Sequence, residues 1–218
     1  MRATVPSLSL VAGIVLAVSA CQGAYYSTME KFGVHKRDIL VDRVEEGRDS
    51  QQEAKEEIVD ALEAFKAVAG FEGGDLEKVY DKLSDEYESS ADAVDEVKER
   101  IDKIEDVSKA LFEEWDGEID EMQDKELKRS SREMLDDTRA RYSKLITAMR
   151  NAESKMEPVL VKLKDHVTFL KHNLNARAVA SLQKNLVTIE TDVSALIADM
   201  EKSIAEADAF IAAMNSEG

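Results

Sequence analysis

The three histidines are the residues to test first for metal chemistry. A di-iron site in a helical bundle requires Glu-x-x-His motifs that project inward. The residue three positions before each histidine is apolar instead: Phe32 before His35, Leu163 before His166 and Phe169 before His172. His166 falls on an apolar track, where a lone histidine is typical of a hydrogen-bonded core or boundary residue. We therefore predict no metal site.

Motifs for nucleotide or acyl chemistry are also missing from the sequence. No Gly-x-x-x-x-Gly-Lys-Ser/Thr phosphate loop occurs, and Gly73-Gly74 is followed by Asp75, which would repel phosphate. No Gly-x-Ser-x-Gly nucleophile elbow occurs either. The many carboxylates are most simply a solvated face. We expect no catalytic residues and no cofactor, and hence a protein that is not an enzyme.

The only cysteine, Cys21, directly follows the small residues Ser19 and Ala20. Residues 1–20 have the pattern of an export signal, with Arg2 before an apolar run that is too short to span a bilayer as a mature helix. The residues at its end resemble the lipobox of bacterial lipoproteins. That resemblance implies cleavage before Cys21 and acylation of its thiol. The alternative is an ordinary secretory signal with an incidental cysteine.

The expected location follows from the same resemblance and from the charge. Gln22 follows the cysteine, and the absence of Asp there implies sorting to the outer membrane, facing the periplasm. The net charge of -17 disfavours binding to nucleic acid and to anionic lipid headgroups. Attachment to the membrane is therefore expected through the N-terminal lipid, in which each buried methylene contributes about 0.8 kcal/mol.

A sustained heptad pattern dominates the rest of the chain, which has only 9 Gly and 2 Pro. Steps that alternate four and three residues meet no charged residue over about five heptads, while Asp, Glu, Lys and Arg crowd the positions between. These positions are Leu76, Tyr80, Leu83, Tyr87, Ser90, Val94, Val97, Ile101, Ile104, Ser108, Leu111 and Trp115. The spacing predicts a long packed helix.

Capping residues mark the ends of several further helices. We expect the first helix to begin near Asp38 and to end before the glycine-rich turn 71–74. Asp75 is then the N-cap of the second helix, and Asn175 is a suitable N-cap for the fourth.

The second and third helices are expected to be separated by a break between about 117 and 130, because the heptad steps meet charged residues there. Ser130 and Glu133 have the spacing of a capping box that would start the third helix. One very long continuous helix is the alternative. Pro158 predicts a kink near Ser154.

Together these patterns predict an all-α fold: an elongated antiparallel up-down helical bundle or coiled coil of about four long helices. The bundle would span residues 38–214, after the signal peptide 1–20 and a lipid-anchored tether 21–37. Short loops between long helices force antiparallel neighbours. A helix of about 45 residues is near 70 Å long, so the body is expected to be a rod.

The up-down alternation of the helices predicts which segments lie at each end of the rod. The turns 71–75 and 173–177 should meet at one end, with segment 117–130, the C-terminus and the lipid anchor at the other. Gly47 and Gln51 interrupt the apolar track of the first helix. We expect looser packing around them.

Two clusters are candidates for contact with a partner. Phe112 and Trp115 either close the end of the bundle or form an exposed anchor, since Trp is enriched at interaction hot spots. The second cluster is a polar and locally basic turn, which either caps helices or touches a partner or the cell wall. Its residues are Lys171, His172, Asn173, Asn175 and Arg177.

Three stretches of the chain, residues 29–38, 111–115 and 169–178, resemble those of a bacterial family, the domain-of-unknown-function group DUF 2959. The resemblance covers nearly the whole mature chain, from about Tyr25 to Met214. It implies a helical, exported, lipoprotein-like molecule and brings no activity, substrate or catalytic residue.

We therefore expect a lipid-anchored helical rod that acts as a spacer or protein-interaction scaffold in the bacterial envelope. Its partner would be another envelope protein or a second copy of the chain. The alternative is an exported bundle that binds a small ligand, a cation or a cell-wall fragment. That alternative would use the space near Gly47, Gln51 and Pro158.

Overall fold

Four long α-helices make up nearly all of residues 35–216, the part of the chain that the computed structural model describes. They are α2 (Lys36–Ala69), α3 (Leu76–Glu121), α4 (Lys125–Lys171) and α5 (Ala176–Ser216). The predicted signal peptide, Cys21 and most of the predicted tether lie outside these residues.

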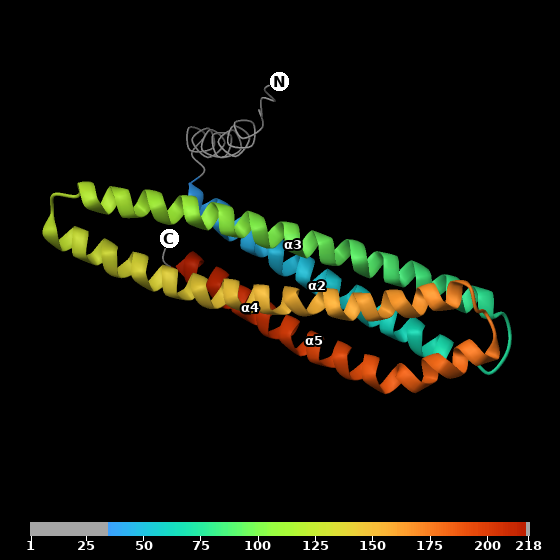
Figure 1. Ribbon diagram of the computed structural model, residues 1–218. Helices are drawn as coiled ribbons and strands as arrows, with labels where there is room; N and C mark the ends of the chain where they lie inside the picture. The colour runs from blue at the N-terminus through green and yellow to red at the C-terminus, as the bar shows by residue number, and fades with distance from the viewer. Residues whose placement is uncertain (1–34, 217–218) are drawn as a thin grey trace, which may run out of the picture.

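The helices run up and down beside one another as an elongated bundle (Figure 1). Helix α2 packs against α3 and α5, and α4 packs against the same two helices, so the four form a closed ring in cross-section. Helix α4 has 47 residues and is about 70 Å long at 1.5 Å per residue. The predicted all-α antiparallel bundle is confirmed.

Helices α3 and α4 extend past the other two at one end of the rod (Figure 1). The Lys36 ammonium pairs with the Glu114 carboxylate, and the Arg37 guanidinium donates to the Met214 carbonyl oxygen. The first turn of α2 and the last turns of α5 are therefore level with Glu114. We call this step the shoulder, and the α3–α4 pair beyond it the extension.

The turn between α3 and α4 covers residues 122–124. A break within the predicted segment 117–130 is therefore confirmed, although it is shorter than that segment, and the continuous-helix alternative is wrong. Asp124 is the N-cap of α4, and its side chain accepts hydrogen bonds from the Glu126 and Leu127 amides at 2.8 and 3.0 Å. Residues 125–134 are helical although they lack an apolar seam. They lie in the extension, where α4 packs against fewer helices and needs a narrower apolar face.

The other predicted helix ends are close to those observed. Asp75 caps α3, with its carboxylate accepting from the Lys78 amide at 3.3 Å, and Asn175 precedes α5, accepting from the Arg177 and Ala178 amides. Helix α4 passes through Pro158 without interruption, and Pro158 is exposed. The kink predicted near Ser154 therefore does not divide the helix.

The buried core follows the predicted apolar seams of the helices. Packing is tight at Gly47 of α2, where we expected it to be loose. Gly47 of α2 is buried, and a Cβ atom built on it would lie 2.7 Å from Ile104 Cδ1 and 3.1 Å from Met149 Cε. The lack of a side chain at Gly47 thus lets α2 approach both α3 and α4 closely. Gln51, one turn later, is fully buried. The expectation of loose packing at Gly47 is wrong.

His166 lies at the boundary of the core. Its ring packs against that of Phe65, with 5.1 Å between the centroids and an angle of 57° between the planes. Burial lowers the pKa of His166 below its usual value of 6.5, and the negative charge of Asp165 opposes this shift only in part.

Replacement of Gly47 by leucine tests the close approach of α2. We expect Gly47→Leu to destabilise the bundle by about 1–3 kcal/mol, because the new side chain overpacks a full core. The same change at Gly117, an exposed glycine of α3 with open space around its Cα, should be neutral or stabilising, because it removes a glycine from a helix interior. Urea unfolding followed by circular dichroism measures both. Equal effects of the two substitutions would contradict the account.

Titration of His166 should make the bundle less stable in mild acid. Because the folded-state pKa is lowered, the unfolded chain binds a proton more readily, and stability is lost as pH falls below about 6.5. His166→Gln should flatten the stability profile between about pH 7 and pH 5. His172→Gln, at an exposed turn position, is the matched control. A slope that persists in His166→Gln would show that other groups cause it.

Candidate functional site

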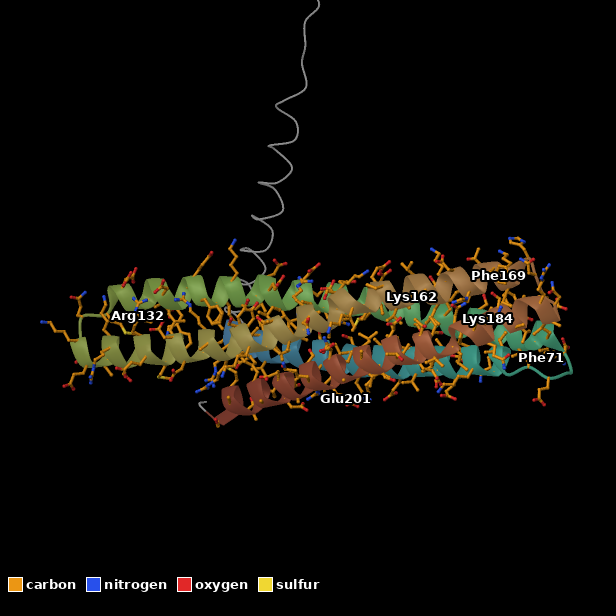
Figure 2. All side chains as sticks on the ribbon, turned by 60° about the horizontal axis from the view of Figure 1, so that its bottom comes forward. Phe71, Arg132, Lys162, Phe169, Lys184 and Glu201 are labelled. Atoms are coloured by element: carbon orange, nitrogen blue, oxygen red, sulfur yellow. The ribbon has the colours of Figure 1, made fainter. Side chains whose placement is uncertain are left out.

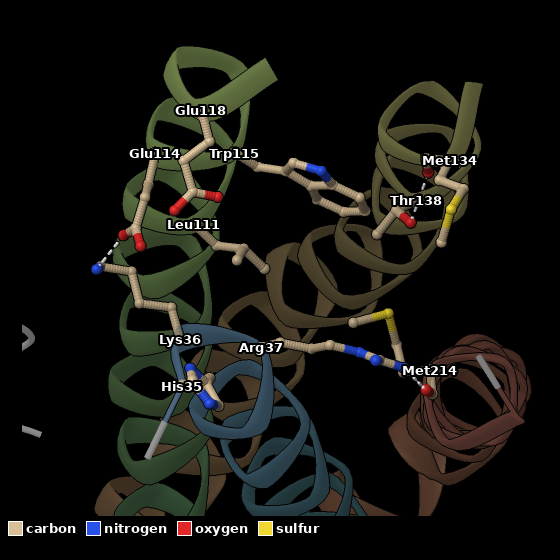
Figure 3. A pocket seen from close by; sticks show the side chains of 10 residues that line it. All are labelled: His35, Lys36, Arg37, Leu111, Glu114, Trp115, Glu118, Met134, Thr138 and Met214. Carbon is tan, nitrogen blue, oxygen red and sulfur yellow. Dashed lines mark hydrogen bonds and ion pairs between the residues drawn. The ribbon is translucent and has the colours of Figure 1, made fainter. Parts of the chain in front are cut away.

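The shoulder contains a groove of about 270 Å³ between the ends of α2 and α5 and the α3–α4 pair (Figure 3). Three consecutive residues at the start of α2 line one side, and the extension provides the apolar surface opposite. The lining residues are His35, Lys36, Arg37, Leu111, Glu114, Trp115, Glu118, Met134, Thr138 and Met214. Segments that are far apart in the sequence therefore meet at this step.

The polar groups of the groove are largely engaged with one another. The Lys36 side chain is only 12% exposed and pairs with Glu114, and the Arg37 guanidinium caps the C-terminal turn of α5 at the Met214 carbonyl. The Trp115 indole donates to the Ser131 hydroxyl at 2.9 Å. What the groove offers is therefore mainly apolar and aromatic: the ring of Trp115, Leu111 and the two methionines.

The base of the extension is a small core of its own. Phe112 is buried with Ile119 and Leu135, and its ring meets that of Tyr142 edge-on at 5.4 Å. The Arg139 guanidinium lies 5.5 Å from the centroid of the Phe112 ring and donates to the Phe112 carbonyl at 3.2 Å. Phe112 thus closes the bundle here, whereas Trp115 is half-buried and faces the groove.

Ion pairs join the two helices of the extension where the apolar seam stops. Arg132 of α4 pairs with Asp116 and with Asp120 of α3, the latter at 3.0 Å. Lys128 donates to the Asp120 carbonyl at 3.0 Å. Exposed pairs of this kind contribute little to stability, typically about 0–1 kcal/mol each.

The second candidate, the turn between α4 and α5, lies at the opposite end of the bundle. Asn173 donates to the Phe169 carbonyl at 2.9 Å and Asn175 caps α5, so both amides have a structural role. The side chains of Lys171, His172 and Arg177 are exposed. That exposure leaves these three residues available to a partner.

Two apolar residues at this distal end were missed in the sequence. Phe169 is 42% exposed and Leu174 is 38% exposed, and Figure 2 shows Phe169 at the same end as Phe71 and far from Arg132. The exposure of Phe169 could have been predicted from the heptad spacing. The next residue, Leu170, is the seam position of α4 and is fully buried. We call the set Phe169, Lys171, His172, Leu174 and Arg177 the distal patch.

Ionisable side chains are part of the shoulder groove lining: His35, Lys36, Arg37, Glu114 and Glu118. Within residues 35–216, no cluster of three or more His, Cys, Asp and Glu residues is arranged to hold a metal ion. In the same part of the chain, no helix is long and apolar enough to cross a membrane.

Comparison with known proteins identifies the family. The model of the family "Protein of unknown function (DUF2959)" matches residues 25–214. No curated protein and no solved structure matches the chain. Of the three stretches that resemble this family, the first contributes residues 35–37 and the second residues from 111–115 to the shoulder groove, and the third, 169–178, contains the distal patch. The chain belongs to the DUF2959 family.

Proposed function

We propose that this protein is a lipid-anchored, non-catalytic helical rod that projects from the outer membrane into the periplasm. Its role is to hold another envelope protein at a fixed distance from the membrane. The observation that carries the proposal is the placement of an exposed apolar and basic patch at one end of the rod, while the N-terminal segment joins at the other.

The distance between the two ends supports a spacer role. Helix α2, which has 34 residues, leads from the shoulder to the turn beside the distal patch and is about 50 Å long. Packed helices resist bending better than a flexible linker does. A partner at the distal patch would therefore stand well clear of the lipid headgroups.

The chemistry of the distal patch fits a protein partner. Phe169 and Leu174 are exposed at 42% and 38%, beside the cationic side chains of Lys171 and Arg177. Aromatic residues and arginine are enriched at interface hot spots. The net charge of the chain is -17, and the α2–α3 turn at the same end carries the exposed residues Glu72 and Asp75, so the α4–α5 turn is the basic one of the two turns at this end.

The membrane anchor is tested by Cys21→Ser. Loss of the only thiol should move the protein from the membrane fraction to the soluble fraction of the envelope, because acyl chains are the expected source of affinity. Ser27→Ala, which leaves the cysteine in place, is the control and should stay with the membrane. Retention of Cys21→Ser in the membrane pellet would contradict a lipid anchor.

The partner surface is tested by placing a photoactivatable amino acid at Leu174 and crosslinking in intact cells. We expect one defined adduct with an envelope protein, and its loss when Phe169→Ser is added. The matched control is the same amino acid at Val187, a residue of α5 that is 72% exposed outside the patch. Adducts of equal yield at both positions, or none at Leu174, would count against the proposal.

A further inference from the structure

The apolar surface of the extension continues from the shoulder groove to the tip of the rod. A second hollow of about 360 Å³ lies at the turn between α3 and α4, and Met134 lines both this hollow and the shoulder groove. Its other apolar lining residues are Met122, which is 36% exposed, and Leu127, which is 66% exposed. Together with Trp115 these residues form one apolar strip, which we call the open face.

The open face lies on the side of the extension that α2 and α5 cover in the rest of the bundle. Met134 of α4 lines the shoulder groove together with Arg37 of α2 and Met214 of α5. Leu127 precedes Met134 by seven residues within the same continuous helix, and a seven-residue interval returns to nearly the same face. A helix pair has to bury its apolar stripes against further elements, and within residues 35–216 no helix covers this one.

The α3 edge of the open face is acidic. Glu118 lines the shoulder groove next to Trp115, and Figure 3 shows Glu118 on α3 and Met134 on α4 with the Trp115 ring between them. Leu111 precedes Glu118 by seven residues and is a seam residue of α3. A carboxylate therefore occupies a position of α3 that carries an apolar side chain one heptad earlier.

The charges of this edge are not neutralised by other side chains. Glu114, at the shoulder, pairs with Lys36. Glu118 and Glu121 are exposed, and among residues 35–216 neither takes part in an ion pair. The open face thus combines an apolar strip with two free carboxylates along one edge.

We propose that the open face binds an amphipathic helix of a partner protein. Apolar residues of that helix cover Trp115, Met134 and Leu127, and its lysine or arginine side chains pair with Glu118 and Glu121. This is helix-in-groove recognition, in which the apolar face of one helix enters an apolar groove. Residues 125–134 of α4 are about 15 Å long, so about ten residues of the partner helix suffice.

The bound helix would take the place that α2 and α5 fill elsewhere in the bundle. The open face and the distal patch lie at opposite ends of the rod, so this second binding surface goes beyond the spacer function and does not depend on it.

A second copy of the chain fits the open face less well. Two extensions can cover each other about a two-fold axis perpendicular to the rod, which sets α3 of one copy beside α3 of the other. Glu118 and Glu121 would then face their own counterparts. Like charges in such positions oppose association, whereas a cationic helix is complementary to the same two side chains.

Trp115, the only tryptophan, reports on occupancy of the open face. The probe is a synthetic helix of about 14 residues with leucine on one face and lysine on the other, and a second probe carries glutamate in place of lysine. We use the chain from residue 21 onward with Cys21→Ser, which contains the whole family domain. The leucine–lysine helix should shift Trp115 emission to the blue and shield it from acrylamide. The leucine–glutamate helix should do neither.

Charge reversal at the α3 edge separates this contact from general attraction to an acidic rod. Glu118→Lys with Glu121→Lys should weaken binding of the leucine–lysine helix by about tenfold or more. Asp85→Lys with Glu88→Lys is the matched control, because these residues are also exposed, lie three apart on α3 and change the net charge equally. The control should lose much less affinity. Far-UV circular dichroism confirms that each variant is folded.

Removal of apolar surface at constant charge tests the strip itself. Leu127→Ser with Met134→Ser should also weaken binding of the leucine–lysine helix. Equal affinities of the two charge-reversed variants, or equal binding of the two probes, would overturn the proposal. Trp115 emission that is already blue and shielded without a probe would assign the open face to another segment of the chain. If the shielding grows with protein concentration, it would assign the face to a second copy, and either result would also overturn the proposal.

Discussion

At Gly47 the backbone of α2 lies against the ends of two side chains, and a Cβ atom built there would be 2.7 Å from Ile104 Cδ1 of α3 and 3.1 Å from Met149 Cε of α4. This approach fixes how α2 sits against both helices, and the seams on either side of it follow. Leu40 and Val44 before Gly47, and Ala54 after it, are fully buried. The small residue therefore sets the width of the bundle at this level and does not weaken it.

A polar group lies within the same seam. The amide of Gln51 is buried with neither its nitrogen nor its oxygen bonded to any described residue, and the hydroxyl of Ser203 on α5 is in the same condition. A buried polar group without a partner costs about 1–3 kcal/mol. The surrounding apolar seam, with residues such as Ile58 and Phe65 fully buried, offsets this locally. The bundle is thus held by the length of its seams more than by uniform packing.

The sequence was a good guide to features set by local chemistry. Heptad spacing predicted the buried positions of α3, and Asp75 and Asn175 were identified as caps from their residue types. The start of α4 was misjudged because a capping-box pattern at Ser130 competed with the true cap, Asp124. Gly47 was misread because spacing alone does not distinguish a gap in a seam from a glycine beside which the side chains of neighbouring helices fill the space.

The shoulder could not be predicted for a different reason. It depends on where α2 begins and α5 ends relative to α3, which is fixed by contacts between distant residues such as Lys36 and Glu114. The distal patch was predicted in its polar part, since turn residues are visible locally. Its apolar part required knowing that Leu170 faces the core and leaves Phe169 outside.

The account rests on helices that run unbroken along the rod, and one distance tests this most directly. Nitroxide labels on Lys125→Cys and Lys171→Cys, in a Cys21→Ser background, mark the exposed ends of α4. Pulsed electron paramagnetic resonance should give a single distribution near about 70 Å, the length of an unbroken helix of this size. A broad distribution, or one centred below about 60 Å, would mean that α4 bends or breaks and would contradict the rod.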